Sequence, residues 1–414
     1  MVLNSILGAL ALLSLALTLW QWLAARRFPP HQRLAVPPPG VPQPEAPGLT
    51  LLKPLKGCDA FTEDCLRSWF AQQYPGPVQI LFGVAAAADP VGDVVRKLQR
   101  EFSARDAQLV ICGALLGANA KVSTLTELER LAKHDLLIIS DADVRVPPDL
   151  LVNLAASLAP CPSSPATPHA PRTTHHESLA PRPSSLPCGL VCCFYRLANP
   201  TTLAMQWEAV AINADFWSQV LQSQSLKPID FALGAVMALR RRALEEIGGF
   251  KALVNCLADD YQLGNRIARR GYSIALCPAV VECWSAPMDW AAVWKHQLRW
   301  ARTIRVCQPV PYFFSILSNA TLWPLLWLAA SPTAPVCAFA LFALLVRILT
   351  ALNLQHRLQP DVRPPVRYAW LVPVKDLLQA AVWLLAFLGN RIEWRGQRMR
   401  LRPDGTLERL DTAH

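Results

Sequence analysis

The stretch SDADVRV, residues 140–146, directly follows the apolar run HDLLIIS at 134–140. The apolar run predicts a buried strand over 135–140, so the carboxylates of Asp141 and Asp143 fall in the turn where that strand ends. Hard divalent cations prefer oxygen ligands, and Mg²⁺ binds through one or two carboxylates together with substrate phosphates. The alternative is a solvated turn that leads into a Pro-started helix. This stretch therefore predicts either a metal site or a capped turn.

Similar apolar runs precede this strand and alternate with helical segments. Such alternation, with helices of about 10 to 15 residues, predicts an α/β fold with a mostly parallel sheet. Ligands of such sheets gather at the carboxyl ends of the strands, and Asp59, Asp89 and Asp141 all follow predicted strand ends. The expected strands are 49–55, 78–85 and 107–113, and the expected helices are 61–73, 91–102 and 121–133.

Residues 159–187 break this pattern because Pro, Ser, Ala and Thr dominate and no apolar periodicity survives. The composition predicts a flexible insertion, although His169, His175 and His176 leave a metal site open as an alternative. Globular patterning then resumes. The expected elements are the run GLVCCFYRL at 189–197, a helix near 201–224, a strand at 234–239 and a helix opened by Leu257.

Four long apolar stretches indicate a membrane protein. Apolar residues make up 52% of the 414-residue chain and charged residues only 17%. Residues 2–25 carry no charge and are long enough to span a bilayer. Three further apolar stretches follow at 313–330, 336–352 and 370–388.

The first apolar stretch is either a signal peptide or an uncleaved anchor. A signal peptide has Lys or Arg before its apolar run, whereas here Arg26 and Arg27 follow it. We therefore expect a transmembrane anchor over 1–25, with its N-terminus outside and the chain from residue 26 onward in the cytoplasm.

Three further crossings would leave the Arg-rich segment 391–402 outside the cytoplasm, against the positive-inside rule. One C-terminal stretch is therefore expected not to cross. The best candidate is 369–389, because it contains Lys375 and Asp376 and charges at bilayer depth are costly. We expect this stretch to dip into the membrane or to lie at its interface.

The net charge of +10 is concentrated near the membrane segments, in RWARTIR at 299–305 and in the tail at 391–402. Such clusters suit an anionic leaflet or a phosphate-bearing substrate, and no nucleic-acid partner is expected. The 12 Cys include no CxxC pair, and Cys192 with Cys193 lies in an apolar run, where buried thiols are expected. A reduced, cytoplasmic compartment fits this usage.

Three more stretches supplement the two Asp of SDADVRV. LKPLKGCD at 52–59 brings two Lys and an Asp to the end of the first strand, and LADDYQLGNRI at 257–267 places paired acids at a helix start. In HQLRWARTIR at 296–305 the spacing puts Arg299 and Arg302, with Lys295, on one helix face. Acids for a metal, bases for a diphosphate and a separate carboxylate as a base make a set suited to group transfer.

The order KPLKGxD, DxD, ADDY and basic-xx-Arg-Trp resembles the ceramide glucosyltransferase family (glycosyltransferase family 21). LADDYQLG and HQLRWARTIRVCQPVPYF lean towards its bacterial relatives, the hopanoid-biosynthesis glycosyltransferases. The resemblance covers 48–310 and the EWRGQRMRLRPDG tail. It implies a GT-A domain at 48–305 after a 26–47 linker, then membrane segments at 306–390 and a basic cytoplasmic tail at 391–414. A multi-pass protein of the bacterial inner membrane is expected.

The resemblance also implies roles for the motif residues. Asp59 would contact the nucleotide, and Asp141 with Asp143 would hold Mg²⁺ or Mn²⁺ against the diphosphate. Asp260 would be the base that deprotonates a lipid hydroxyl, while Arg299 and Trp300 would flank the diphosphate and the acceptor. The family usually has Gln or Arg where this chain has His296, which leaves the role of that position open.

Further substrate contacts are expected from Lys56, Asp89, Lys121, Asp259 and His296. Each motif residue also has a structural alternative. Asp59 could cap the helix at 61–73, and the paired acids 259 and 260 could merely favour a helix start. Trp300 could be an interfacial anchor, and the two Lys could be solvated.

The function expected from this set is inverting transfer of one hexose, glucose or N-acetylglucosamine, from a UDP-sugar to a lipid hydroxyl. The acceptor would be a ceramide or a hopanoid polyol in the bilayer. A processive polysaccharide synthase of related fold is the rival enzyme, but the few spans argue against the pore that such an enzyme needs. An inactive membrane scaffold is the non-enzyme rival, and the intact acids argue against it.

Overall fold

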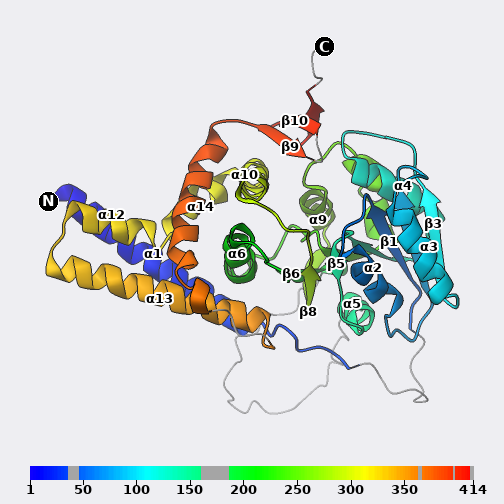
Figure 1. Cartoon of the computed structure of the whole chain (residues 1–414), viewed down its shortest axis with the longest axis horizontal. Helices are drawn as coiled ribbons and strands as arrows, with labels where there is room; N and C mark the ends of the chain where they lie inside the picture. Colours follow the sequence, from blue (N-terminus) through cyan, green and yellow to red (C-terminus); the bar gives the residue numbers. More distant parts are fainter. Residues whose placement is uncertain (36–45, 160–185, 362–365, 395–396, 411–414) are drawn as a thin grey trace, which may run out of the picture.

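A mixed, mostly parallel sheet of eight strands forms the centre of the protein (Figure 1). The computed structural model describes residues 1–35, 46–159, 186–361, 366–394 and 397–410. The strand order is β3-β2-β1-β4-β7-β6-β8-β5, in which β3, β2, β1 and β4 run parallel. The strands are β1 Leu49–Leu55, β2 Val78–Val84, β3 Asp106–Ile111, β4 Leu136–Ser140, β5 Val144–Arg145, β6 Cys188–Leu197, β7 Val236–Arg240 and β8 Ser273–Cys283.

Helices cover both faces of this sheet because successive side chains of its strands point to opposite sides. In β1, Leu52 belongs to one buried apolar cluster, with Trp217, and Leu51 belongs to the other, with Trp207. The helices are α2 Thr62–Phe70, α3 Val91–Glu101, α4 Ala120–Leu131, α5 Leu150–Leu158, α6 Leu203–Val210, α7 Trp217–Gln224, α8 Arg241–Glu245, α9 Asp259–Arg269 and α10 Trp290–Cys307. The predicted α/β fold with a mostly parallel sheet is confirmed.

The predicted helix near 201–224 is a continuous helical segment whose middle widens into a π-helical turn. The Thr202 hydroxyl caps its start by accepting the Met205 amide, and the turn η1 (Ala211–Phe216) separates α6 from α7. The flexible insertion and the histidines expected within it fall almost entirely in residues 160–185, which lie outside the described residues.

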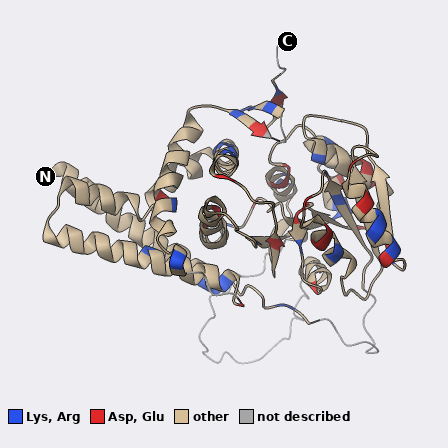
Figure 2. Cartoon of the chain, in the orientation of Figure 1, with Lys and Arg blue, Asp and Glu red and all other residues tan. Residues whose placement is uncertain are grey.

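Two described helices, α1 (Val2–Arg27) and α13 (Ala334–Leu358), are long and apolar enough to cross a membrane. The bent pair Pro309–Ser318 (α11 with η3) and α12 (Leu322–Ala330), with 55° between its halves, adds a third if it is one span. Helices α1, α12 and α13 extend away from the sheet, whereas α14 (Leu371–Phe387) runs beside α6 and α10 (Figure 1). Figure 2 shows few charged residues on the outer part of α1, α12 and α13. The helices support a membrane protein.

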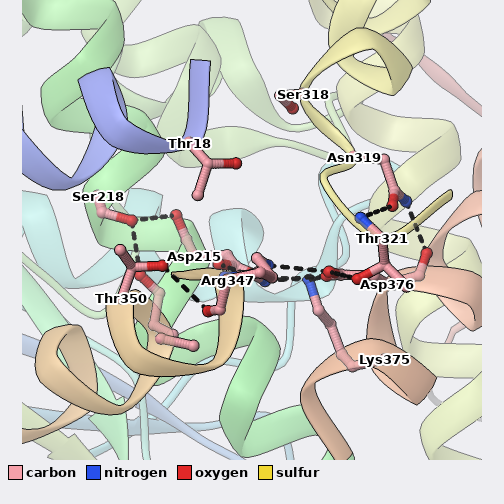
Figure 3. Close-up of polar contacts among 12 residues, drawn as sticks. Thr18, Asp215, Ser218, Ser318, Asn319, Thr321, Arg347, Thr350, Lys375 and Asp376 are labelled. Carbon is pink, nitrogen blue, oxygen red and sulfur yellow. Dashed lines mark hydrogen bonds and ion pairs between the residues drawn. The ribbon is translucent and has the colours of Figure 1, made fainter. Parts of the chain in front are cut away.

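A buried cluster of four charges joins the helical bundle to the main domain (Figure 3). Arg347 of α13 donates to Asp215 of η1 at 2.9 Å and to Asp376 of α14 at 2.9 Å. Lys375 of α14 pairs with both carboxylates, and the Thr321 hydroxyl donates to Asp376 at 2.6 Å. Two positive and two negative groups balance, so these charges are paired inside the protein rather than exposed to lipid.

The chain then returns to the main domain as a small antiparallel sheet. Its strands are β9 Arg391–Trp394, β10 Gln397–Leu401 and β11 Leu407–Arg409. Met399, Leu401 and Leu407 pack on Leu257, two residues before the first acid of the ADDY motif. The tail expected to be merely basic therefore packs against the loop that carries this motif.

Candidate active site

Parallel β1, β2 and β4 bring three predicted site residues to one edge of the sheet. Asp59 follows β1, Asp89 follows β2 and Asp141 follows β4, and all three strand ends lie at the carboxyl edge. This is the edge at which ligands of such sheets bind. The DADV turn itself is fixed by its backbone, because Asp141 donates to the Ala235 carbonyl at 3.3 Å and Asp143 accepts from the Trp284 amide at 2.9 Å.

Lys121 connects this turn with the paired acids of α9. The ammonium of Lys121 lies 2.8 Å from Asp141 and 3.1 Å from Asp259, and its side chain is only 9% exposed. Burial alone lowers the pKa of Lys121, but Asp141 and Asp259 outweigh it and raise the pKa above its usual value. Solvated surface, the alternative for this Lys, is therefore wrong. Asn119 supports the arrangement by capping α4 at Val122 and donating to the Cys256 carbonyl at 2.8 Å.

Asp260 is the second acid of the pair that begins α9. Burial, followed by the negative charge of Asp259, raises the pKa of Asp260 to about 6, while Lys121 opposes the shift. A base with a pKa just below the working pH is mostly ionised and still accepts a proton readily. Its surroundings are tight, because a Cβ added to Gly234 would lie 2.6 Å from Asp260 Oδ2.

Asp141 and Asp143 suit a divalent cation held partly by a substrate. Restricted hydration, followed by the charge of Asp141, raises the pKa of Asp143 to about 6. No described Lys, Arg or His forms an ion pair with Asp143, and the described residues contain no group of three or more His, Cys, Asp or Glu able to enclose a metal. Proteins usually bind Mg²⁺ through one or two carboxylates, and substrate phosphates and water complete its coordination shell. These residues therefore fit the predicted Mg²⁺ or Mn²⁺.

Lys53, the first of the two Lys in LKPLKGCD, was not among the predicted substrate contacts, and it contacts the start of the DADV turn. Its ammonium donates to the Asp141 carbonyl at 2.5 Å and to the Ser140 hydroxyl at 3.2 Å, over the Trp69 ring. Burial lowers the pKa of Lys53 to about 8. The available signal was a single Lys inside the otherwise apolar strand LTLLKPL, which a buried β1 tolerates only with nearby acceptors.

The loop after β1 is organised by Asp89 and Asp59. Asp89 accepts the Gly57 amide at 3.0 Å, which holds Gly57 at φ 71, and Asp59 accepts from the Phe61 amide and the Thr62 hydroxyl. Asp59 thus closes the turn before α2, whose N-cap is Phe61 and has no side-chain cap, and the predicted nucleotide contact of Asp59 stays a prediction. Lys56 is exposed beside this loop.

Helix α10 carries the basic-xx-Arg-Trp motif and packs on α6 and α14. His296 donates to or accepts from Glu208 at 2.6 Å through Nδ1, and its ring lies 4.7 Å from the Trp300 ring. Trp300 is partly buried against Phe216, so it packs within the protein, while Arg299 lies one residue before it. The structure thus places His296 and Trp300 in contact. The substrate contacts expected of this motif stay predictions.

The basic face expected on α10 is mostly used by the tail. Lys295 pairs with Glu393 at 3.1 Å, and Arg302 donates to the Arg391 carbonyl. Neither cation is therefore placed for the diphosphate in this structure. The spacing of Lys295 and Arg302 along α10 shows that they share one helix face. It does not show that β9 packs against that face and takes up both side chains.

Comparisons with known proteins agree with this geometry. The family model for Glycosyl transferase family 21 matches residues 6–182 and 177–407. Ceramide glucosyltransferase 1 of Caenorhabditis elegans is 25% identical over 239 residues, which are 57% of this chain and 45% of that protein. Ceramide glucosyltransferase 3 of the same organism is 21% identical over 374 residues, 87% of this chain and 74% of that protein. The first match thus spans less than half of its relative.

A solved structure shares the fold. The mannosyltransferase PcManGT from Pyrobaculum calidifontis, in complex with GDP-Man and Mn²⁺, superposes with a TM-score of 0.50 at 19% identity. The match covers 91% of this chain and 99% of that chain. The family match extends over nearly the whole chain and includes the DADV turn, the paired acids and α10. The chain belongs to glycosyl transferase family 21 and is a glycosyltransferase.

Proposed function

We propose that this glycosyltransferase transfers one hexose from a UDP-sugar to the hydroxyl of a membrane lipid, with inversion at the anomeric carbon. Ceramides and hopanoid polyols are the acceptor classes, and glucose or N-acetylglucosamine is the sugar. The observation that supports this most is Asp260, a carboxylate with a pKa of about 6 beside the acids that Lys121 joins. The ceramide glucosyltransferase relatives support the choice of a lipid acceptor.

In the proposed reaction, Asp260 takes the proton of the lipid hydroxyl as its oxygen bonds to the anomeric carbon. The bond from that carbon to the diphosphate breaks, and UDP leaves with the bonding electrons. One displacement inverts the configuration and needs one base. Mg²⁺ or Mn²⁺ held by Asp141 and Asp143 would neutralise the leaving diphosphate. Lys53 fixes the turn on which both carboxylates lie.

The apolar helices support an acceptor that stays in the membrane. The α10 helix lies between the sheet and α14, which belongs to the bundle with α1 and α13 (Figure 1). We place the site on the cytoplasmic side of a bacterial inner membrane, where soluble UDP-sugars occur and where the basic segments fit the positive-inside rule. This sidedness is part of the proposal.

The test is a transfer assay with purified protein, UDP-glucose and a short-chain ceramide, read by mass spectrometry. The wild type is expected to add one hexose in the presence of Mn²⁺ and to lose activity reversibly in EDTA. Asp260→Asn keeps the shape of the side chain and removes its basicity, so turnover should fall about 10²–10⁴-fold while UDP binding persists.

Asp259→Asn is the matched control, since it alters the neighbouring acid, and its effect should be much milder. The opposite ranking would assign the base to Asp259. Products with more than one added hexose would favour a processive polysaccharide synthase. Full activity in EDTA would show that transfer needs no divalent cation.

A further inference from the structure

Glu208 is a buried carboxylate that the proposed reaction does not use. It lies in the apolar helix α6, its side chain is 1% exposed, and no described Lys or Arg pairs with it. Its Oε1 lies 2.6 Å from His296 Nδ1 and accepts a hydrogen bond from the side-chain amide Nε2 of Gln297 at 2.8 Å. A buried carboxylate is costly unless hydrogen bonds satisfy it, so these two α10 contacts account for its retention in the core.

The contact with Glu208 leaves one edge of the His296 ring available. A carboxylate accepts hydrogen bonds only, so Nδ1 carries the hydrogen and Nε2 is the other ring position. The His296 side chain is 28% exposed, and no described residue forms a hydrogen bond with its Nε2. The Trp300 ring packs against the imidazole at 4.7 Å and limits its rotation. An oriented, accessible ring nitrogen is therefore presented beside the Arg-Trp pair.

A series of aromatic contacts leads from His296 into the sheet. Trp300 packs on Phe216 with ring centroids 6.2 Å apart, and Phe216 packs on Tyr195 at 5.2 Å. Burial raises the pKa of Tyr195 well above its ordinary value, and the charges of Asp260 and Glu208 both add to this effect. Tyr195 lies near the end of β6, which runs parallel to β4 because both strands pair antiparallel with β7. The aromatic contacts therefore connect the Glu208–His296 pair to the carboxyl edge of the sheet, where Asp141 lies.

The two helices that carry this pair also pack on the apolar bundle. Helices α6 and α10 both pack on α14, and Ala301 of α10 joins Val382 and Ala386 of α14 in one apolar cluster. In Figure 1 these two helices lie between the apolar bundle and the sheet. A lipid held at the bundle would therefore reach the sheet past α6 and α10, the two helices that carry the pair.

We propose that Glu208 is a positioning residue that holds His296 so that Nε2 accepts a hydrogen bond from a second polar group of the lipid acceptor. This inference rests on the proposed lipid glycosylation. The acceptor class that satisfies it has a hydroxyl or an amide N–H close to the reacting hydroxyl. A simple long-chain alcohol has no such group and gains nothing from the pair.

The test compares the Michaelis constants of a short-chain ceramide and of a long-chain primary alcohol, in detergent micelles with UDP-glucose. Glu208→Gln can donate to Nδ1 and so release the fixed tautomer. We expect it to raise the KM for the ceramide about tenfold, the loss of one hydrogen bond, with the KM for UDP-glucose unchanged. The alcohol should show no such increase.

His296→Gln provides the background that separates positioning from packing. A Gln needs no tautomer to be fixed, so adding Glu208→Gln to His296→Gln should cause no further rise in KM. Nitrogen NMR of labelled His296 tests the pair without any acceptor, and should show Nδ1 protonated in the wild type and a mixture in Glu208→Gln. The inference would be overturned if Glu208→Gln raised the KM equally for the ceramide and the alcohol, or equally in the wild-type and His296→Gln backgrounds. An unchanged His296 tautomer in Glu208→Gln would overturn it as well. A wild type that glycosylates neither acceptor refutes the proposed function instead, while the NMR result still decides the tautomer.

Discussion

At the scale of single residues, the buried cation Lys121 joins the DADV turn to the paired acids of α9. Asp141 and Asp259 contact it directly, whereas Asp143 and Asp260 have raised pKa values of about 6 because burial and a neighbouring acid outweigh the cation. Lys121 thus pairs with one acid of each motif, while the described residues place no Lys, Arg or His in an ion pair with the other acid.

The pH dependence of transfer should report Asp260. Because the base must be ionised, kcat/KM is expected to be level above pH 7 and to fall about tenfold per unit below about pH 6. Saturating Mn²⁺ would keep Asp143 ionised, so that the titration of Asp143 would not contribute to the acid limb, the fall of kcat/KM below about pH 6. Asp259→Asn removes the like charge that raises the pKa of Asp260, so the acid limb should move to lower pH. An unchanged limb would show that another group titrates.

The acids of the motifs could be predicted from the sequence because their spacing and strand ends are local features. Lys53 and Glu208 could not, since each is a charge inside an apolar run whose partners come from distant segments. Lys53 needs the carbonyl of Asp141, and Glu208 needs α10, which begins more than 80 residues later. The sequence shows that a charged side chain lies in an apolar run. Only the folded structure shows which groups form hydrogen bonds with that side chain.

At the scale of elements, the strands that form continuous apolar runs were predicted well, because a parallel strand buried on both faces has no polar interruption. The run LTLLKPL matches β1 at both ends. By contrast β8 contains Pro278 and alternates in burial, and it was not predicted. The strands β9 to β11 were read as a basic tail because Arg residues mask the alternation of Ile392, Met399 and Leu401.

The small C-terminal sheet is expected to support the acid pair, which gives an element-scale prediction. Leu401→Ala removes a side chain that is 1% exposed and packs on Leu257, at a cost of about 2–5 kcal/mol. The loop before Asp259 should loosen, so transfer should fall and the tail should be cut sooner in limited proteolysis. Arg400→Ala changes an exposed neighbour on the same strand and should affect neither measurement. Full activity with a protected tail in Leu401→Ala would show that the sheet is dispensable.

At the scale of the whole molecule, the cluster in Figure 3 should fix the helical bundle to the main domain. Arg347→Leu would leave two carboxylates with one cation, and breaking such a buried network costs about 3–5 kcal/mol. Thermal unfolding in detergent should therefore begin at a lower temperature. The double variant Arg347→Leu with Asp376→Leu leaves Lys375 paired with Asp215 and is neutral again, so it should be more stable than the single variant. Additive losses would show that the charges are not coupled.

The orientation of the chain can be tested at the same scale. The prediction that 369–389 does not cross rested on the cost of Lys375 and Asp376, and these charges are paired in the cluster. The shortness of α14, with 17 residues, still agrees with it. Leu410→Cys in a Cys-depleted variant should resist a membrane-impermeant thiol reagent in intact cells and react after lysis. Ready labelling in intact cells would place the tail outside.

The small C-terminal sheet also bears on the order of events during synthesis. Thr406 bridges to Cys256, and the Leu407 amide donates to the Asn255 carbonyl at 2.7 Å. The loop before the paired acids therefore obtains its last backbone partners only after the ribosome has passed residue 407. By then every apolar helix described here has been translated. A chain still emerging from the ribosome thus lacks these contacts beside the paired acids until all of its apolar helices have been made.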